Sequence, residues 1–180
     1  MQVMEMSERL RALLLAGEKH QARELLFALQ ESGWELRGVD LSELDLQGVY
    51  LEEADLTGAN FNGSDLRGAM LSRANLNEAT LIGARLQGAD LTGAELFQAN
   101  LRHASLVECD LQRADLGAAN LSEVDLRGAN LQHADLGDAL LRGADLRGAD
   151  YALSTRWPEG VDPREEGAYL AHGWGDWVEL

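Results

Sequence analysis

A large apolar residue returns at every fifth position of this chain, from residue 36 to residue 151. Counted as pentads over residues 34–153, the repeat has 24 units, of which 22 are centred on Leu, one on Phe61 and one on Tyr151. The position two residues before each centre is usually small, and Ala fills it in 17 units. An internal repeat that covers two thirds of a chain constrains its architecture more than any other feature.

A period of five fits neither a regular helix nor a continuous strand. On an α-helix, successive centres would lie about 140° apart and would form no stripe. On one long strand, they would alternate between the two faces. Both conflicts disappear if each pentad is a short extended piece followed by a corner. The central residue and the residue two before it then point inward, and the residue between them points outward.

The two residues after each centre are predicted to form the corner. Gly occupies the second of these positions in 11 of the 24 pentads, for example at Gly58 and Gly88. Glycine adopts the backbone dihedral angles of tight corners more easily than other residues. Repeated corners wind the chain into a solenoid whose coils stack about 4.8 Å apart. The pattern by itself leaves the number of sides per coil open.

The repeated motif A-(D/N)-L-x-x, as in residues 54–58 (ADLTG) and 99–103 (ANLRH), resembles the pentapeptide-repeat family. The resemblance implies an all-β solenoid, namely a right-handed quadrilateral parallel β-helix with four pentads in each coil. With four sides, 24 pentads make about six coils and a rod about 29 Å long.

The repeat divides the chain into three predicted parts. Residues 1–33 lack the period and are predicted to form a helical N-terminal cap, because apolar residues such as Leu10 and Leu25 recur there at helical spacing. The cap would shield the open end of the first coil, although an independent partner-binding helix is the alternative. Residues 34–153 form the predicted β-helix. Residues 154–180 are predicted to be a short irregular C-terminal cap, with Trp157 closing the last coil.

Composition argues against several classes of function. The net charge of −16 disfavours direct binding to nucleic acid or to an anionic membrane. No apolar run approaches the length of a transmembrane helix, so a cytoplasmic protein is expected. Cys109 is the single cysteine and occupies an inward position, which predicts a buried structural thiol.

The sequence contains no recognisable catalytic pattern. The four histidines are scattered, and zinc-binding, phosphate-binding and nucleophile motifs are missing. The glycines follow the corner positions of the repeat, as structural residues would. We therefore expect a protein that is not an enzyme and that has no cofactor and no metal site.

Charge is distributed unevenly if each coil has four sides. The side centred on Leu36 and on every twentieth residue up to Leu136 is called the acidic side below. Its outward residues carry seven acids against Arg37, a net charge of −6. We take these acids as candidate partner-binding residues, together with two tryptophans of the C-terminal tail: Glu35, Asp55, Glu78, Glu95, Asp115, Asp135, Asp138, Trp174 and Trp177.

Two classes of function remain. The first is a rigid interaction or scaffold module that presents its acidic surface to an unknown protein partner. The second comes from the family resemblance, because quinolone-resistance members are thought to occupy the DNA site of a type II topoisomerase such as DNA gyrase. In that case the acidic side would imitate DNA. The tail tryptophans suggest either simple capping or a partner contact, including a homodimer through the C-terminal end.

Overall fold

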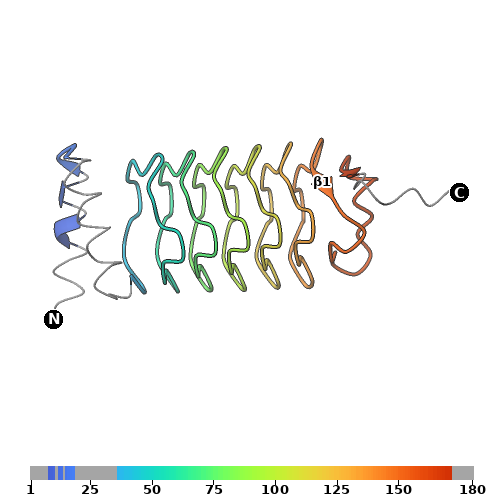
Figure 1. The fold of residues 1–180 in the computed structure, drawn as a ribbon, viewed down its shortest axis with the longest axis horizontal. Helices are drawn as coiled ribbons and strands as arrows, with labels where there is room; N and C mark the ends of the chain where they lie inside the picture. Colours follow the sequence, from blue (N-terminus) through green and yellow to red (C-terminus); the bar gives the residue numbers. More distant parts are fainter. Residues whose placement is uncertain (1–7, 11, 14, 19–35, 172–180) are drawn as a thin grey trace, which may run out of the picture.

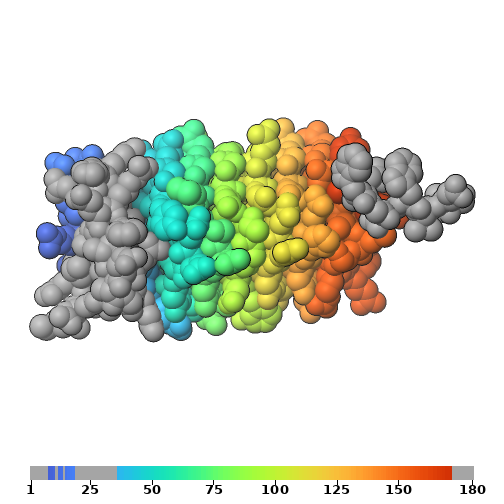
Figure 2. All heavy atoms as spheres, viewed as in Figure 1, coloured from blue at the N-terminus to red at the C-terminus, as the bar shows by residue number. Residues whose placement is uncertain are grey.

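The computed structural model describes residues 8–10, 12–13, 15–18 and 36–171, of which residues 36–171 form an elongated stack of coils (Figure 1). Parallel bridges join outward residues 20 positions apart, beginning with Asp40 and Asn60 and continuing to Asn130 and Asp150. Twenty residues are four pentads, so each coil has four sides. In the space-filling view, sequence position runs steadily along the long axis of the stack (Figure 2). The four-sided solenoid expected from the family resemblance is confirmed.

The centre of each described coil is filled by the two inward positions of the pentad. Leu56 and Phe61 are fully buried, and the small residues at Ala59 and Ala89 are buried to at least 99%. Cys109 occupies an Ala position and is equally buried. Burial removes the thiol from water and raises the pKa of Cys109 to about 12, which keeps it protonated. The predicted inward and outward positions are therefore confirmed across the repeat, with Leu141 and Ala144 only partly buried.

Each side holds a narrow hydrogen-bonded ladder between successive coils. The amide of Leu56 donates to the carbonyl of Asn75 at 2.8 Å, and the amide of Asn75 donates to the carbonyl of Ala54 at 2.9 Å. The same two bonds recur along the stack, which satisfies the backbone around the inward residues. Pairing every coil with both neighbours makes the solenoid a stiff rod.

In the pentads centred on residues 36 to 146, each corner is a β-turn with a positive φ at the second corner position. In the pentad centred on Leu56, the amide of Ala59 donates to the carbonyl of Leu56 at 2.9 Å, and Gly58 has a φ of 67°. Positive φ at this position is typical of a type II turn, which favours glycine. Twelve non-glycine residues nevertheless adopt it, including Ala118 at 54°. The ladder bonds on both sides of the corner hold these residues in a conformation that glycine would adopt more easily.

The outward Asp or Asn of the motif has a local role at the corner. Its side-chain oxygen accepts the amide N–H two residues later, as Asp55 does from Thr57 at 3.1 Å. Glu95 occupies this position without forming the bond. There Asn77, from the preceding coil, accepts the amide N–H of Phe97 at 2.8 Å instead. The Asp and Asn residues of the repeat are thus explained in part by backbone hydrogen bonding.

The ladder continues beyond the regular repeat through an inserted residue. Strand β1 (Asp150–Tyr151) pairs in parallel with strand β2 (Tyr169–Leu170). On the acidic side, Asp135 pairs with Arg156, which is 21 rather than 20 positions away. The extra residue lies between Tyr151 and Arg156, and it places Thr155 inward. Residues 155–157 and 168–170 therefore extend two sides of the solenoid by one further, incomplete coil.

Both ends of the rod contribute side chains to the core. Trp157 is half-buried against it, and its ring meets that of Tyr151 edge to face, with the ring centroids 5.7 Å apart. At the N-terminal end, residues 8–10, 12–13 and 15 are helical, and Leu10 is fully buried in the same core cluster. Most of the predicted cap over residues 1–33 lies outside the described residues, so the helical cap stays a prediction.

Candidate partner-binding surface

The described acids of the acidic side fall into two groups by exposure. Asp55 and Asp135 lie near its two ends and are half-buried, whereas four acids lie between or beside them and are exposed: Glu78, Glu95, Asp115 and Asp138. Bridges place Glu95, Asp115 and Asp135 on three successive coils. The sequence therefore identified a real column of carboxylates, although its members differ in environment.

The two acids near the ends each have an arginine partner. Arg37 lies 3.1 Å from Asp55, and Arg156 forms an ion pair with Asp135. Burial alone would raise the pKa of Asp55, but hydrogen bonds from Thr57 and Arg37 together outweigh it and lower that pKa. Arg156 comes from the C-terminal segment and enters this column only because of the inserted residue. With both arginines counted, the six described acids leave a net charge of −4 on this side.

The four exposed acids have no cationic partner among the residues that the structure describes. Glu95 accepts a hydrogen bond from the side-chain amide of Asn77 at 3.0 Å, and Asp115 accepts the amide N–H of Gly117 at 2.9 Å. Phe97 follows Glu95 by two residues on the same coil and is 44% exposed. We call the exposed acids Glu78, Glu95, Asp115 and Asp138, together with Phe97, the central acidic patch. Sequence analysis missed Phe97, although its outward phase in the pentad could have identified it.

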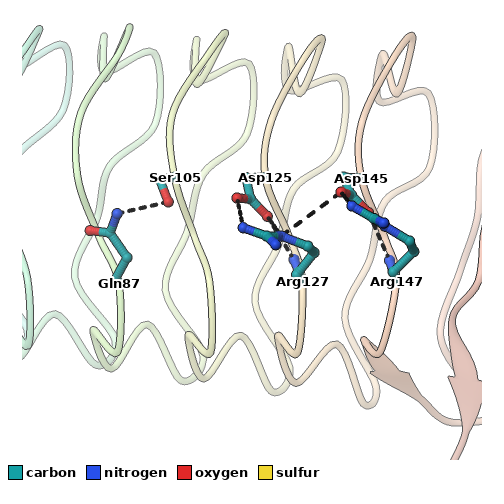
Figure 3. Close-up of polar contacts among 6 residues, drawn as sticks. All are labelled: Gln87, Ser105, Asp125, Arg127, Asp145 and Arg147. Carbon is teal, nitrogen blue, oxygen red and sulfur yellow. Dashed lines mark hydrogen bonds and ion pairs between the residues drawn. The ribbon is translucent and has the colours of Figure 1, made fainter.

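The side centred on Leu46 and every twentieth residue up to Leu146 contrasts with the acidic side, and we call it the Asp–Arg side. In three of its pentads the outward Asp binds the Arg two residues later through two parallel hydrogen bonds, as Asp145 does with Arg147 at 2.8 and 2.6 Å. Figure 3 shows two of these pairs on successive coils. The bonds from Arg147 lower the pKa of Asp145 to about 2.

The ion pairs of the Asp–Arg side neutralise the charges of the paired Asp and Arg residues. Arg127 also lies 3.8 Å from Asp145 of the next coil, which links two pairs along the rod (Figure 3). On the two coils that precede these pairs, Gln87 donates to the hydroxyl of Ser105 at 2.8 Å (Figure 3). The aspartates of these pairs are therefore neutralised locally, whereas the four exposed acids of the acidic side have no cationic partner among the described residues.

Three candidate residues lie outside the described residues, namely Glu35, Trp174 and Trp177. Within the part of the chain that the structure describes, no group of three or more His, Cys, Asp or Glu side chains could hold a metal ion. No helix in that part is long and apolar enough to cross a membrane. His103 and His133 belong to different sides, and His103 lies 3.2 Å from Glu123 rather than beside a nucleophile.

Comparison with solved structures finds similar repeat proteins. A pentapeptide repeat protein from Nostoc Pcc 7120 is 43% identical, with a TM-score of 0.56, over 57% of this chain and 84% of its own. A trypsin-treated form of QnrB1, described as a plasmid-mediated fluoroquinolone resistance protein, is 21% identical with the same TM-score. That match covers 74% of this chain and 76% of QnrB1, and at this identity it shows a likeness of fold alone. No curated protein matches the sequence.

The family model for pentapeptide repeats matches eight copies in this sequence. The matched segments are residues 35–73, 59–96, 70–106, 94–132 and 119–150, which together cover more than half of the chain. These segments cover the coils in which Leu and Ala occupy the inward positions. The chain is a member of the pentapeptide-repeat family, whose proteins are generally structural or interaction modules.

Proposed function

We propose that this protein is a non-enzymatic interaction module that presents the central acidic patch to a basic surface of a protein partner. The observation that carries the proposal is the difference between paired and unpaired acids. Asp55 and Asp135 have arginine partners, whereas the four acids of the patch have none among the described residues. An unpaired carboxylate on a rigid rod is available to a partner without first breaking an internal ion pair.

The exposed aromatic ring of Phe97 is a second observation that supports the same proposal. Aromatic side chains often supply much of the binding energy of protein interfaces, while surrounding charges steer the partner and fix its orientation. Phe97 is 44% exposed. Gly117 occupies the same pentad position on the next coil, and because it has no side chain it does not cover the Phe97 ring. The partner surface that fits this patch is an apolar pocket surrounded by Lys or Arg.

The experiment is a capture assay with a matched pair of double variants. Glu95→Gln with Asp115→Asn removes two charges from the patch, and Asp90→Asn with Asp110→Asn removes two charges from another side. Outward Asn already occurs throughout the repeat, so both variants should fold. We expect the first variant to lose a partner that the parent and the second variant both retain, and we expect added salt to weaken that complex. Equal capture by both variants would contradict the proposal.

Mimicry of nucleic acid is the second candidate function. The favouring observation is the uninterrupted column of Glu95, Asp115 and Asp135 on hydrogen-bonded neighbouring coils. Coils rise about 4.8 Å, whereas phosphates of one DNA strand follow at about 3.4 Å, so the column is less densely charged than DNA. The test is topoisomerase supercoiling with and without a quinolone, in the presence of the parent and of the patch variant. Inhibition or protection by the parent alone would support mimicry, and no effect of the parent would exclude that target.

The two ends of the rod complete the proposal. Helical residues near Leu10, whose side chain is buried in the core, support a helical N-terminal cap. The half-buried Trp157 supports a C-terminal cap that also offers a surface for a homodimer. Deletion of residues 164–180 should then change the mass measured by light scattering, or cause aggregation. An unchanged mass without aggregation would show that the segment is neither a cap nor a dimer contact.

A further inference from the structure

A hollow of about 400 Å³ lies on the side centred on Leu41 and every twentieth residue up to Leu141. Arg102, Ser122 and Arg142 occupy the first corner position of three successive coils, so a short side chain lies between two long ones. The lining residues are Arg102, Asn120, Ser122, Glu123 and Arg142. The hollow therefore follows from the order of side chains in one column of the repeat.

The hollow is lined mainly by hydrogen-bond donors that have no partner in the part of the chain that the structure describes. The side-chain oxygen of Asn120 already accepts the amide N–H of Ser122 at 3.1 Å, and the Asn120 amide nitrogen donates to none of the described residues. The Ser122 hydroxyl has no hydrogen-bond partner among the described residues. Nine of the twelve described arginines lie within ion-pair distance of a carboxylate, but Arg142 does not.

The one acid in the hollow is already engaged. Glu123 lies 3.3 Å from Arg102 through one carboxylate oxygen and 3.2 Å from His103 through the other. Two arginines against one glutamate leave a local excess of positive charge in a protein whose net charge is −16. At physiological ionic strength, charges more than about 8 Å away are largely screened, so the local excess decides which ligand is attracted.

We propose that this hollow binds the phosphate group of a small organic phosphate monoester. A phosphate group offers several acceptor oxygens to the guanidinium of Arg142, the amide of Asn120 and the hydroxyl of Ser122, and arginine binds phosphate through paired hydrogen bonds. Leu140 precedes Arg142 by two positions on the same side and is 57% exposed, so it offers an apolar contact for the organic part. The volume lies within the range of small-molecule sites, about 300–1,000 Å³.

The test is an NMR titration of the isotope-labelled protein with three probes: phenyl phosphate, inorganic phosphate and benzoate. Phenyl phosphate should shift the amide signals of Ser122 and Arg142 in a saturable way. Inorganic phosphate should bind more weakly because it lacks the apolar part, and benzoate more weakly because it has one negative charge. Inorganic phosphate equal to phenyl phosphate would overturn the monoester assignment, and tighter binding of benzoate would overturn the phosphate assignment.

Three variants separate this site from general attraction to positive charge. Arg142→Gln should weaken phenyl phosphate binding at least about tenfold, the loss expected for one charge-assisted contact. Arg113→Gln removes an arginine outside the hollow that likewise has no acid partner among the described residues, and it should leave binding unchanged. Glu123→Gln frees Arg102 and should tighten binding. Equal affinity for the parent, Arg142→Gln and Arg113→Gln, with unchanged spectra elsewhere, would overturn the proposal, as would the absence of saturable shifts in the parent.

Discussion

The aromatic ring of Phe97 lies over the backbone of Gly117 in the next coil. A β-carbon added at Gly117 would lie 3.2 Å from Cδ2 of Phe97 and 3.0 Å from Oδ1 of Asp115, and Gly117 itself is buried. Unlike the glycines at the second corner position, Gly117 has no positive φ. It is therefore required by the space that Phe97 occupies and not by backbone conformation.

Gly117→Ala should destabilise the protein by about 1 kcal/mol, at the low end of overpacking because Phe97 can move outward. The measurement is chemical denaturation, and the matched control is Gly137→Ala, where the added carbon meets the flexible end of Arg156 at 3.3 Å. In the double variant with Phe97→Ala, the cost of Gly117→Ala should largely disappear. A cost that persists without the ring would show that the contact is not its cause.

The second corner position gives two predictions of opposite sign, one for a glycine that is replaced and one for a glycine that is introduced. Gly88 has a φ of 66° and no atom within 4 Å of an added β-carbon, so Gly88→Ala should cost about 1 kcal/mol through backbone strain alone. Ala118 adopts a φ of 54°, so Ala118→Gly should be neutral or slightly stabilising, because the relief of strain opposes the entropy that glycine loses. Thermal melts of both variants check the pair. A stabilised Gly88→Ala would contradict the assigned turn.

Much of this fold could be predicted from the sequence because its period maps directly onto geometry. Leu56 and Ala59 had to point inward for a five-residue unit to close, and Gly58 marked the corner. The ion pairs could not be predicted in the same way. Arg156 reaches Asp135 only after a one-residue insertion that shifts the register, and nothing in the composition shows where such a residue is accommodated. Summing charge by side therefore located the column of acids but overstated its net charge.

A substitution at the inward residue Ala89 tests how narrow the interior of the solenoid is. Ala89 is 1% exposed and lies one coil before Cys109 in the same column. Ala89→Leu should overpack the interior and cost about 1–3 kcal/mol or more. Asp90→Asn is the control, because Asn can still accept the amide N–H that Thr92 donates at 2.9 Å. Thermal melts in which both variants match the parent would contradict the assignment of inward and outward positions.

The Asp–Arg side predicts a specific response to acid. The folded-state pKa of Asp145 is about 2, below the value of about 3.9 expected in the unfolded chain. Its contribution to stability is therefore fully present above about pH 4 and is lost as the pH falls toward 2. Arg147→Lys keeps the charge but not the paired hydrogen bonds, so the Asp145 pKa should rise toward its ordinary value. Carboxyl-carbon NMR titration of the parent and the variant measures this, and an unchanged pKa would exclude the paired geometry as the cause.

The inserted residue near the end of the repeat provides the last test. Thr155 takes the inward place that Ala usually fills and is only 7% exposed. Its hydroxyl donates to the carbonyl of Leu131 at 2.9 Å, and it accepts the amide N–H groups of Ala152 at 3.0 Å and His133 at 3.1 Å. One hydroxyl thus satisfies three backbone groups that the change of register would otherwise leave without partners.

Thr155→Val keeps the shape of the side chain but removes all three bonds, so it should cost about 1–3 kcal/mol. Thr155→Ser keeps the hydroxyl and should lose only the small contribution of a methyl group. Because Trp157 follows two residues later, loosening this corner should also increase the exposure of its ring, which a red shift of tryptophan fluorescence under native conditions would report. If Thr155→Val is as stable as Thr155→Ser and its fluorescence is unchanged, the hydroxyl does not hold the C-terminal segment on the last coil.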